Sequence, residues 1–362
     1  MKLSPEPCGL CVLCESLTEI NRMGEKVDSQ SQAVIGVDIG GTNIKIALVE
    51  PRRQELLETV RFKTLVDRGP DAVLADLSAH LTELSRQAEK DGFVLRGVGV
   101  GCAGLMDLAN GIVITSPNLP GWENFQLGKK LSEELRVPVF IENDVNCICY
   151  GEYWLGAARD LGDFLCVAPG TGVGGCLFID GKVWERHGYS AGEVGHITIQ
   201  PDGEKCRCGN YGCLETLASA SWLVWRAKER LDKGVKSSLK HKLDSSGGLD
   251  AESIYSAAVA GDKLAQELFH LVGTSLAIAI ANVAHLLGIR SFLIGGGLSN
   301  GWKAFIGPLR EELGRRLTFV PPAEVKVVRA QLGGDAGPLG GAYLAGSRTG
   351  LIASSPPPES KG

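Results

Sequence analysis

Two glycine-rich turns, each set between two β-strand-like runs, constrain the fold of this 362-residue chain most strongly. In the first, the apolar run 33–38 ends in an acid, the turn 39–43 reads IGGTN, and a second apolar run covers 44–49. The same order recurs with run 164–169, turn GTGVGG at 170–175 and run 176–179. Glycine lets a polyanion approach the backbone, and exposed amides at such tips can wrap phosphate oxygens. The repeat therefore predicts two similar lobes, each offering a phosphate-binding loop.

Asp38, at the end of the first run, has two interpretations. It could hold a magnesium ion through water, since hard cations prefer oxygen ligands. It could also be an exposed acid beside an ordinary hairpin turn. The turn is not a Walker A loop, because no GK[ST] follows it.

Strand-like and helix-like segments alternate along the remainder of the chain, which predicts an α/β fold. Further strands are expected at 59–64, 97–101, 137–141, 291–294 and 324–328. Helices are expected at 70–91, 145–158, 214–231, 251–260, 263–287, 302–317 and 334–346, and a surface loop at 234–248.

Three further loops could contact a ligand. Gly104 lies in a small-residue loop after strand 97–101, and Gly295–Gly297 form a third glycine-rich strand end against which a flat adenine could lie. Residues 116–122 combine the amide of Asn118 with the ring of Trp122, a pairing that carbohydrate sites use. A turn pinned by prolines is the alternative for this last loop.

Asp144 follows strand 137–141 and the pair Glu142–Asn143, and it opens a predicted helix. It could cap that helix, since Asp is a favoured N-cap, and taken alone this is the preferred interpretation. It could instead be a general base at the carboxyl end of a strand, where open α/β sheets place ligands.

One imidazole and three thiols, His196, Cys206, Cys208 and Cys213, lie within eighteen residues. A His plus three Cys fills a tetrahedral zinc shell and leaves no position for water, so the metal is expected to be structural. If one ring nitrogen of His196 binds the metal, the other must carry the proton and can donate.

Composition narrows the classes of protein. A net charge of −5 with no long basic run argues against nucleic acid as a partner. The apolar stretch 271–289 is interrupted by polar and glycine residues, so we expect a buried helix and no membrane association. No signal peptide is recognised, and the eleven cysteines are expected to be reduced in a cytoplasmic protein.

The two ends of the chain are expected to lie outside the lobes. Residues 1–32 look like a flexible extension that contains Cys8, Cys11 and Cys14, a set that lacks a fourth zinc ligand. Residues 349–362, with three prolines, are expected to be a disordered tail.

Together these blocks resemble the ROK family of sugar kinases and repressors, and most closely its ATP-dependent bacterial glucokinase branch. The resemblance covers roughly residues 33–348, and its most specific element is the His-x9-Cys-x-Cys-x4-Cys spacing. The matching blocks are 38–42, 117–122, 142–144, 170–175, 192–196 with the three cysteines, and 295–297. Pro169 stands before the second turn, where the family usually carries an aliphatic residue.

The resemblance implies a two-lobed actin-like ATPase (ribonuclease H-like) fold with the active site in the interlobe cleft. Residues 33–143 with 333–348 would form the N-terminal lobe, and 144–332 the C-terminal lobe that carries the zinc site. It also makes Asp144 the catalytic base rather than a cap. The sugar would contact Gly104, Asn118, Asn143, Asp144, Glu193, His196 and Glu215. ATP and Mg²⁺ would contact Asp38, Gly40, Gly41, Thr42, Lys45, Gly170, Thr171, Gly172, Gly296 and Gly297, and Zn²⁺ would be held by His196, Cys206, Cys208 and Cys213.

The resemblance implies phosphorylation of the 6-hydroxyl of glucose by Mg-ATP, in a homodimer or homotetramer. An N-acetylhexosamine kinase, for N-acetylmannosamine or N-acetylglucosamine, is the main alternative. Polyphosphate is a second possible donor, against which the zinc cluster and the 295–297 turn argue. A sugar-responsive transcriptional regulator is expected less, because residues 1–32 show no basic helix pair.

Overall fold

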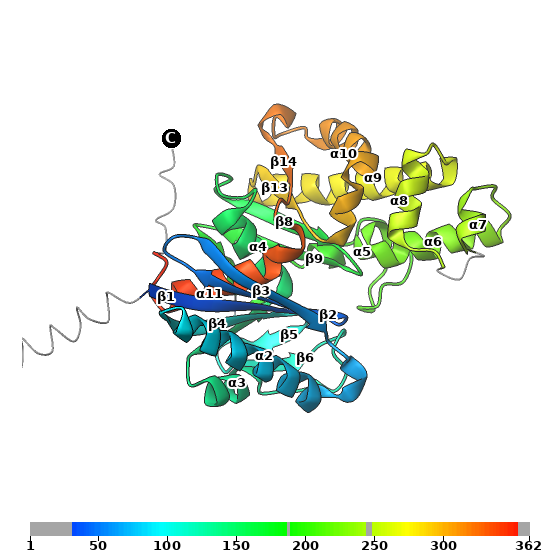
Figure 1. Cartoon of the computed structure of the whole chain (residues 1–362). Helices are drawn as coiled ribbons and strands as arrows, with labels where there is room; N and C mark the ends of the chain where they lie inside the picture. The colour runs from blue at the N-terminus through cyan, green and yellow to red at the C-terminus, as the bar shows by residue number, and fades with distance from the viewer. Residues whose placement is uncertain (1–30, 187–188, 244–247, 354–362) are drawn as a thin grey trace, which may run out of the picture.

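The computed structural model describes residues 31–186, 189–243 and 248–353, and it contains two five-stranded sheets of the same design (Figure 1). The order of the first sheet is β3-β2-β1-β4-β7, and that of the second is β10-β9-β8-β13-β14. In each sheet the first three strands are antiparallel neighbours and the last two run parallel to the central strand. This repeat confirms the predicted two-lobed actin-like fold.

The first sheet comprises β1 (Ser31–Ile39), β2 (Asn43–Glu50), β3 (Glu55–Lys63), β4 (Phe93–Cys102) and β7 (Val139–Asn143). The second comprises β8 (Phe164–Pro169), β9 (Val173–Ile179), β10 (Lys182–Val183), β13 (Ser291–Ile294) and β14 (Lys326–Arg329). Two short hairpins are β5 (Leu105–Asp107) with β6 (Ile112–Thr115), and β11 (Glu185–Arg186) with β12 (Tyr189–Ser190). The helices are α2 (Pro70–Lys90), α3 (Leu127–Leu135), α4 (Asp144–Leu155), α5 (Glu215–Ala218), α6 (Ala220–Asp232), α7 (Leu239–Leu243), α8 (Ala251–Val259), α9 (Lys263–Leu287), α10 (Trp302–Arg316) and α11 (Ala336–Arg348).

The first sheet is apolar on both faces because helices cover both. Ile35, Val37 and Ile39 of β1 belong to the core that includes the buried faces of α2 and α3. Val34, on the opposite face of the same strand, packs in the cluster formed by α11. Side chains alternate across a strand, so a run without polar interruption is what a strand covered on both sides requires.

Helix α9 is the central helix of the second lobe. It is long enough and apolar enough to span a membrane, but half of its most apolar part is buried inside the protein. Its buried residues pack in one core with α6, α8, α10 and the second sheet. The apolar character of α9 is therefore explained by packing inside the lobe, as expected for stretch 271–289.

Helices α4 and α11 cross between the two sheets, and glycines set how closely they approach (Figure 1). A Cβ on Gly340 of α11 would lie 1.7 Å from the carbonyl oxygen of Cys147 in α4, and one on Gly151 would lie 2.2 Å from that of Ala336. On the other side of α11, a Cβ on Gly36 of β1 would lie 1.8 Å from the carbonyl oxygen of Pro338. Backbone therefore packs directly on backbone, which explains the Gly/Ala composition of α11.

The structure differs from the sequence expectations in several places. The helix expected at 214–231 is divided at Ser219, whose extended backbone separates α5 from α6. The segment 234–248 contains α7. Strand β1 begins at Ser31, inside the expected extension, and Leu351 donates its N–H to Gly346 O at 2.8 Å, so the chain packs on α11 beyond 348. Cys8, Cys11, Cys14 and residues 354–362 lie outside the described residues.

The close approach of α4 and α11 can be tested with matched glycines. Gly340→Ala is expected to lower the free energy of unfolding by about 3 kcal/mol or more, because the added methyl group meets fixed backbone. Gly307→Ala in α10, where a Cβ meets nothing within 4 Å, is expected to be neutral or to stabilise by up to ~1 kcal/mol. Urea unfolding of both variants measures this, and equal effects would contradict the packing argument.

Candidate active site between the two lobes

Asp144 is the first residue of α4, and it does not cap the helix. The N-cap is Asn143, whose Oδ1 accepts the N–H groups of Val145 at 2.9 Å and Asn146 at 3.4 Å. The capping interpretation of Asp144 is therefore wrong, because the neighbouring amide satisfies the helix end. Asp144 retains one short-range contact, from Val145 N to its own Oδ1 at 3.0 Å.

The carboxyl group of Asp144 is kept less acidic than usual by its surroundings. Burial raises its pKa from 3.8 to about 6, and the charge of Asp38 adds to the rise. Glu193, the exposed N-cap of the 3-10 turn η2 (Val194–His196), contributes in the same direction. Three carboxylates are thus close enough to influence one another: Asp38 of the first lobe, Asp144 at the start of α4, and Glu193 of the second lobe.

Asp38, the next-to-last residue of β1, pairs with Lys45 on β2. Lys45 Nζ lies 3.7 Å from Asp38 Oδ2 and also donates to Gly334 O at 2.7 Å. Burial raises the pKa of Asp38, while the adjacent ammonium opposes that rise. A Cβ on Gly337, in the first turn of α11, would lie 2.8 Å from Asp38 Cγ, so α11 closes over this acid.

The first glycine-rich turn lies against the loop that carries Asn118. A Cβ on Gly41 would be 2.8 Å from Asn118 O, and the turn is closed by Gly40 N donating to Asn43 O at 3.1 Å. Gly104 has φ of 126° and its carbonyl accepts Asn143 Nδ2 at 3.4 Å. Asn118, Gly104 and Asn143 thus belong to one connected region of the first lobe.

Trp122 does not face this region. It is 1% exposed, and its ring packs on Phe125 with centroids 4.8 Å apart inside the core of the first lobe. The idea that Trp122 stacks on a sugar is therefore wrong, and the proline-pinned turn explains this part of the loop.

The second glycine-rich turn keeps a regular hairpin shape despite Pro169. Strand β8 pairs with β9 as far as Pro169, and Gly170 N donates to Gly172 O at 2.8 Å. Ala220 N donates to Gly170 O at 2.7 Å, which accounts for the break between α5 and α6. Gly296, with φ of 65°, packs against Pro169 O, so the 295–297 strand end lies beside this turn.

Glu215, the first residue of α5, joins the second turn to the cysteines. Its Oε2 accepts Val173 N at 3.0 Å, and its Oε1 lies 3.6 Å from Cys206 Sγ. A Cβ on Gly172 would be 2.4 Å from Glu215 Oε2, so the glycine makes room for the carboxylate. Glu215 therefore has a structural contact in addition to its predicted contact with a sugar.

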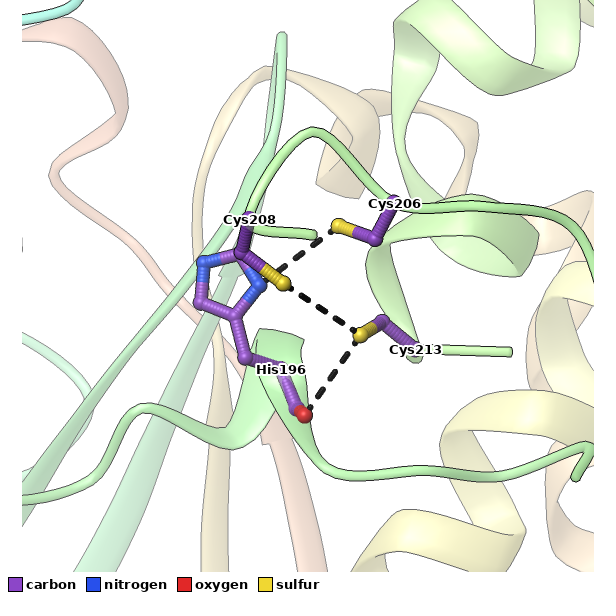
Figure 2. A group of neighbouring side chains, drawn as sticks. All are labelled: His196, Cys206, Cys208 and Cys213. Atoms are coloured by element: carbon purple, nitrogen blue, oxygen red, sulfur yellow. Dashed lines mark hydrogen bonds between the residues drawn. The ribbon is translucent and has the colours of Figure 1, made fainter. Parts of the chain in front are cut away.

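His196, Cys206, Cys208 and Cys213 come together as the sequence spacing predicted (Figure 2). Their ligand atoms all lie within 4.8 Å of one another, with Cys208 Sγ and Cys213 Sγ 3.7 Å apart and Cys206 Sγ 3.7 Å from His196 Nδ1. Tetrahedral zinc with bonds of about 2.3 Å to sulfur requires sulfur atoms about 3.7 Å apart, and a disulfide requires about 2.05 Å. The cluster fits a zinc ion and not a disulfide.

A cavity of about 620 Å³ lies beside this cluster and extends to the second glycine-rich turn and to the loop that carries Asn118. Because Nδ1 of His196 faces Cys206, Nε2 is the ring nitrogen left for a ligand. The predicted site residues that line the cavity are Asn118, Thr171, Gly172, His196, Cys206, Cys208 and Glu215. Its wall also includes Ser219, Ser221, Trp222 and Trp225, which the sequence analysis missed and which the spacing on one helix could have indicated.

Glu142 is a further residue that the sequence analysis left out of the site. It is 2% exposed, and its Oε1 accepts Asn143 N at 2.8 Å and Asn146 Nδ2 at 2.9 Å. Burial raises its pKa to about 7, although these hydrogen bonds oppose the rise. An acid directly before Asn143 and Asp144 was the available signal. Glu142 holds the strand–helix junction from which Asp144 projects.

Comparison with known proteins agrees with the fold and indicates the class of protein. A protein of Thermotoga maritima named Glucokinase is 36% identical over 321 residues, 88% of this chain and 98% of the relative. The solved structure of a ROK family glucokinase from Streptomyces griseus, in complex with glucose and AMPPNP, has a TM-score of 0.73 and 32% identity, covering 86% of this chain and 98% of that chain. An Escherichia coli N-acetylmannosamine kinase is 29% identical, over 86% of this chain and 97% of the relative.

Two lobes of the same sheet design and a cavity between them, together with these relatives, define a sugar kinase. The chain belongs to the ROK family, whose model matches residues 34–348.

The raised pKa of Asp144 predicts how stability depends on pH. Between the unfolded value near 3.8 and the folded value of about 6, the folded protein holds a proton that the unfolded chain releases. The free energy of unfolding therefore falls as pH rises through this window, and the full cost of the buried charge is present above it. The Asp144→Asn variant carries no charge at this position, so its free energy of unfolding does not fall in this way.

Urea unfolding without divalent ions, at pH 4.5 and at pH 8, measures this effect. Asp144→Asn is expected to gain roughly 1–3 kcal/mol over the wild type at pH 8, and much less at pH 4.5. Asp180→Asn, on an exposed turn, serves as the control. An advantage of Asp144→Asn that does not change with pH would contradict the assigned pKa.

Proposed function

We propose that this chain transfers the γ-phosphoryl group of ATP to the 6-hydroxyl of glucose. The observations that carry the proposal are the interlobe cavity, which Asn118, Thr171, Gly172 and the His/Cys cluster line, and the raised pKa of Asp144, to which Asp38 and Glu193 contribute. The relatives named Glucokinase support glucose as the acceptor, and the Streptomyces griseus complex with glucose and AMPPNP supports ATP as the donor.

Asp144 acts as the general base. At neutral pH a carboxyl group with a pKa of about 6 is ionised, yet it is more basic than an ordinary aspartate. It takes the proton of the 6-hydroxyl while that oxygen bonds to the γ-phosphorus and the bond to the ADP oxygen breaks. Because Asn143 caps α4, the carboxylate of Asp144 is available for this step.

The two glycine-rich turns hold the phosphates from opposite lobes. Gly40, Gly41 and Thr42 act from the first lobe with Lys45, and Gly170, Thr171 and Gly172 act from the second. Asp38, an acid near Asp144 and partly offset by Lys45, suits a water-mediated contact to Mg²⁺. Magnesium neutralises phosphate charge, and the protein mainly positions the reactants. Gly296 and Gly297 would support the nucleoside.

The sugar hydroxyls are held by groups from both lobes. Asn118, Asn143 and the Gly104 region act from the first lobe. Glu193, His196 and Glu215 act from the second. With zinc on Nδ1, His196 would carry its proton on Nε2 and donate from there. Three thiolates and one imidazole would complete a zinc shell, so a zinc ion bound here would be structural and would hold His196 and Glu215 in place.

An N-acetylhexosamine kinase is the second candidate, supported by the Escherichia coli relative named N-acetylmannosamine kinase. A coupled ADP-release assay with glucose, mannose, fructose, N-acetylmannosamine and N-acetylglucosamine separates the two. Glucose is expected to give the highest kcat/KM. A higher value for an N-acetylhexosamine would replace glucose as the substrate. The dimeric or tetrameric state and the cytoplasmic location stay predictions.

The role of Asp144 predicts the kinetics of its amide variant. Asp144→Asn is expected to lower kcat by 10²–10⁴-fold, because the amide cannot accept the proton. Glucose affinity, measured by calorimetry, is expected to change less than about tenfold. In the wild type, log kcat is expected to fall as pH drops below about 6. Asp144→Asn with more than a tenth of wild-type kcat would exclude Asp144 as the base.

The role of zinc predicts a loss of sugar binding when the metal is removed. Elemental analysis is expected to find one zinc ion bound by His196, Cys206, Cys208 and Cys213. Removal by a chelator is expected to weaken glucose binding at least tenfold, since His196 and Glu215 lose their fixed positions. Tryptophan fluorescence measures glucose binding, because Trp222 and Trp225 line the cavity. A zinc-free protein with native circular dichroism and unchanged glucose affinity would disprove this coupling.

A further inference from the structure

Glu152 is a fully buried carboxylate that the proposed mechanism does not use. It lies in the last turn of α4 and is 0% exposed. In residues 31–186, 189–243 and 248–353, no Lys, Arg or His forms an ion pair with it. A buried charge without a counter-ion is costly unless hydrogen bonds stabilise it.

Three backbone N–H groups from two separate segments supply that stabilisation. Ala157 N donates to Glu152 Oε2 at 2.8 Å, Gln331 N donates to the same oxygen at 3.1 Å, and Leu332 N donates to Oε1 at 2.7 Å. Two of these donors lie about 180 residues away in sequence. Glu152 therefore joins the end of α4 to the segment that leads into α11.

A carboxylate is the side chain that this arrangement requires. Both of its oxygens accept, whereas the amide of glutamine offers one acceptor and one NH₂ donor. If glutamine kept its oxygen at the Oε2 position, its NH₂ group would face the N–H of Leu332. Aspartate is one methylene shorter, so it would not reach the Gln331–Leu332 segment while α4 stays in place.

The segment held by Glu152 continues directly into residues at the nucleotide side of the site. Leu332 is followed by η5 (Gly333–Asp335), in which Gly334 O accepts Lys45 Nζ at 2.7 Å. Gly337, two residues after Asp335, lies against the Asp38 carboxyl group. Helix α4, to which Glu152 belongs, begins at Asp144. One side chain thus fixes the Lys45–Asp38 side of the site relative to the helix that carries the base.

We propose that Glu152 is a positioning residue for nucleotide binding: it holds the Gln331–Asp335 segment so that Gly334 O and α11 keep Lys45 and Asp38 in place for the ATP phosphates. The inference rests on the proposed function of Lys45 and Asp38. It assigns no contact between Glu152 and the nucleotide. Loss of the carboxylate should therefore weaken nucleotide binding and leave the sugar contacts of the second lobe intact.

Glu152→Gln tests this inference in the full chain by calorimetry, with Mg-AMPPNP and glucose titrated separately. The Kd for Mg-AMPPNP is expected to rise about tenfold, while the Kd for glucose stays within twofold of the wild type. Glu133→Gln, the same chemical change at an exposed position on α3, is the matched control and should change neither value. All titrations are made at least 20 °C below the melting temperature of the variant.

The outcomes are distinguishable. A lower melting temperature with unchanged affinity for both ligands would make Glu152 a structural residue only and overturn the inference. A wild type that binds Mg-AMPPNP but does not phosphorylate glucose would overturn the proposed function and leave the binding test valid. If Glu152→Gln does not fold, Gly156→Ala replaces it, because a Cβ there would lie 2.1 Å from Glu152 Oε2 and displace the carboxylate. Unchanged Mg-AMPPNP affinity in that variant would also overturn the inference.

Discussion

The close contact between α4 and α11 is the constraint on which the remainder of the structure depends. Glycines let the two helices and the first sheet approach backbone to backbone, with Gly340 against Cys147 O and Gly36 against Pro338 O. Side chains of ordinary size at these positions would separate the helices. Helix α4 begins at Asp144 and α11 begins beside Asp38, so the packing of two helices also sets the distance between two acids of the site. The glycines of α11 and β1 therefore also influence how far apart Asp38 and Asp144 lie.

The site divides its tasks between rigid elements. The first lobe and the junction helix provide acids and one glycine-rich turn, and the second lobe provides the other turn and the His/Cys cluster. Glu215 connects the last two, since it accepts the Val173 N–H and lies next to Cys206 Sγ. Under the proposed function, a change in the His/Cys cluster would reach the second glycine-rich turn through the side chain of Glu215. The buried carboxylates Glu142 and Glu152 support α4 at opposite ends.

Much of the fold and the site could be predicted from the sequence because the signals were local. The repeated strand–turn–strand pattern predicted two like lobes, and the ligand spacing predicted the His/Cys cluster. Trp122 and Asn143 show where such reasoning fails. Whether an aromatic ring faces a cavity or a core depends on Phe125 and the packing of the first lobe, and whether Asp144 or Asn143 caps α4 depends on backbone angles at the junction. Glu152 was not predicted as functional because two of its partners lie about 180 residues away.

The central claim is that one interlobe site brings a zinc-held histidine and the Asp144 base to the same sugar. A crystal structure of the chain with glucose, with anomalous scattering recorded at the zinc edge, tests it most directly. The account predicts one zinc bound by His196 Nδ1 and the three Sγ atoms, a sugar hydroxyl on His196 Nε2, and the 6-hydroxyl within hydrogen-bond distance of Asp144. Zinc on Nε2, or a 6-hydroxyl that lies away from Asp144, would contradict it.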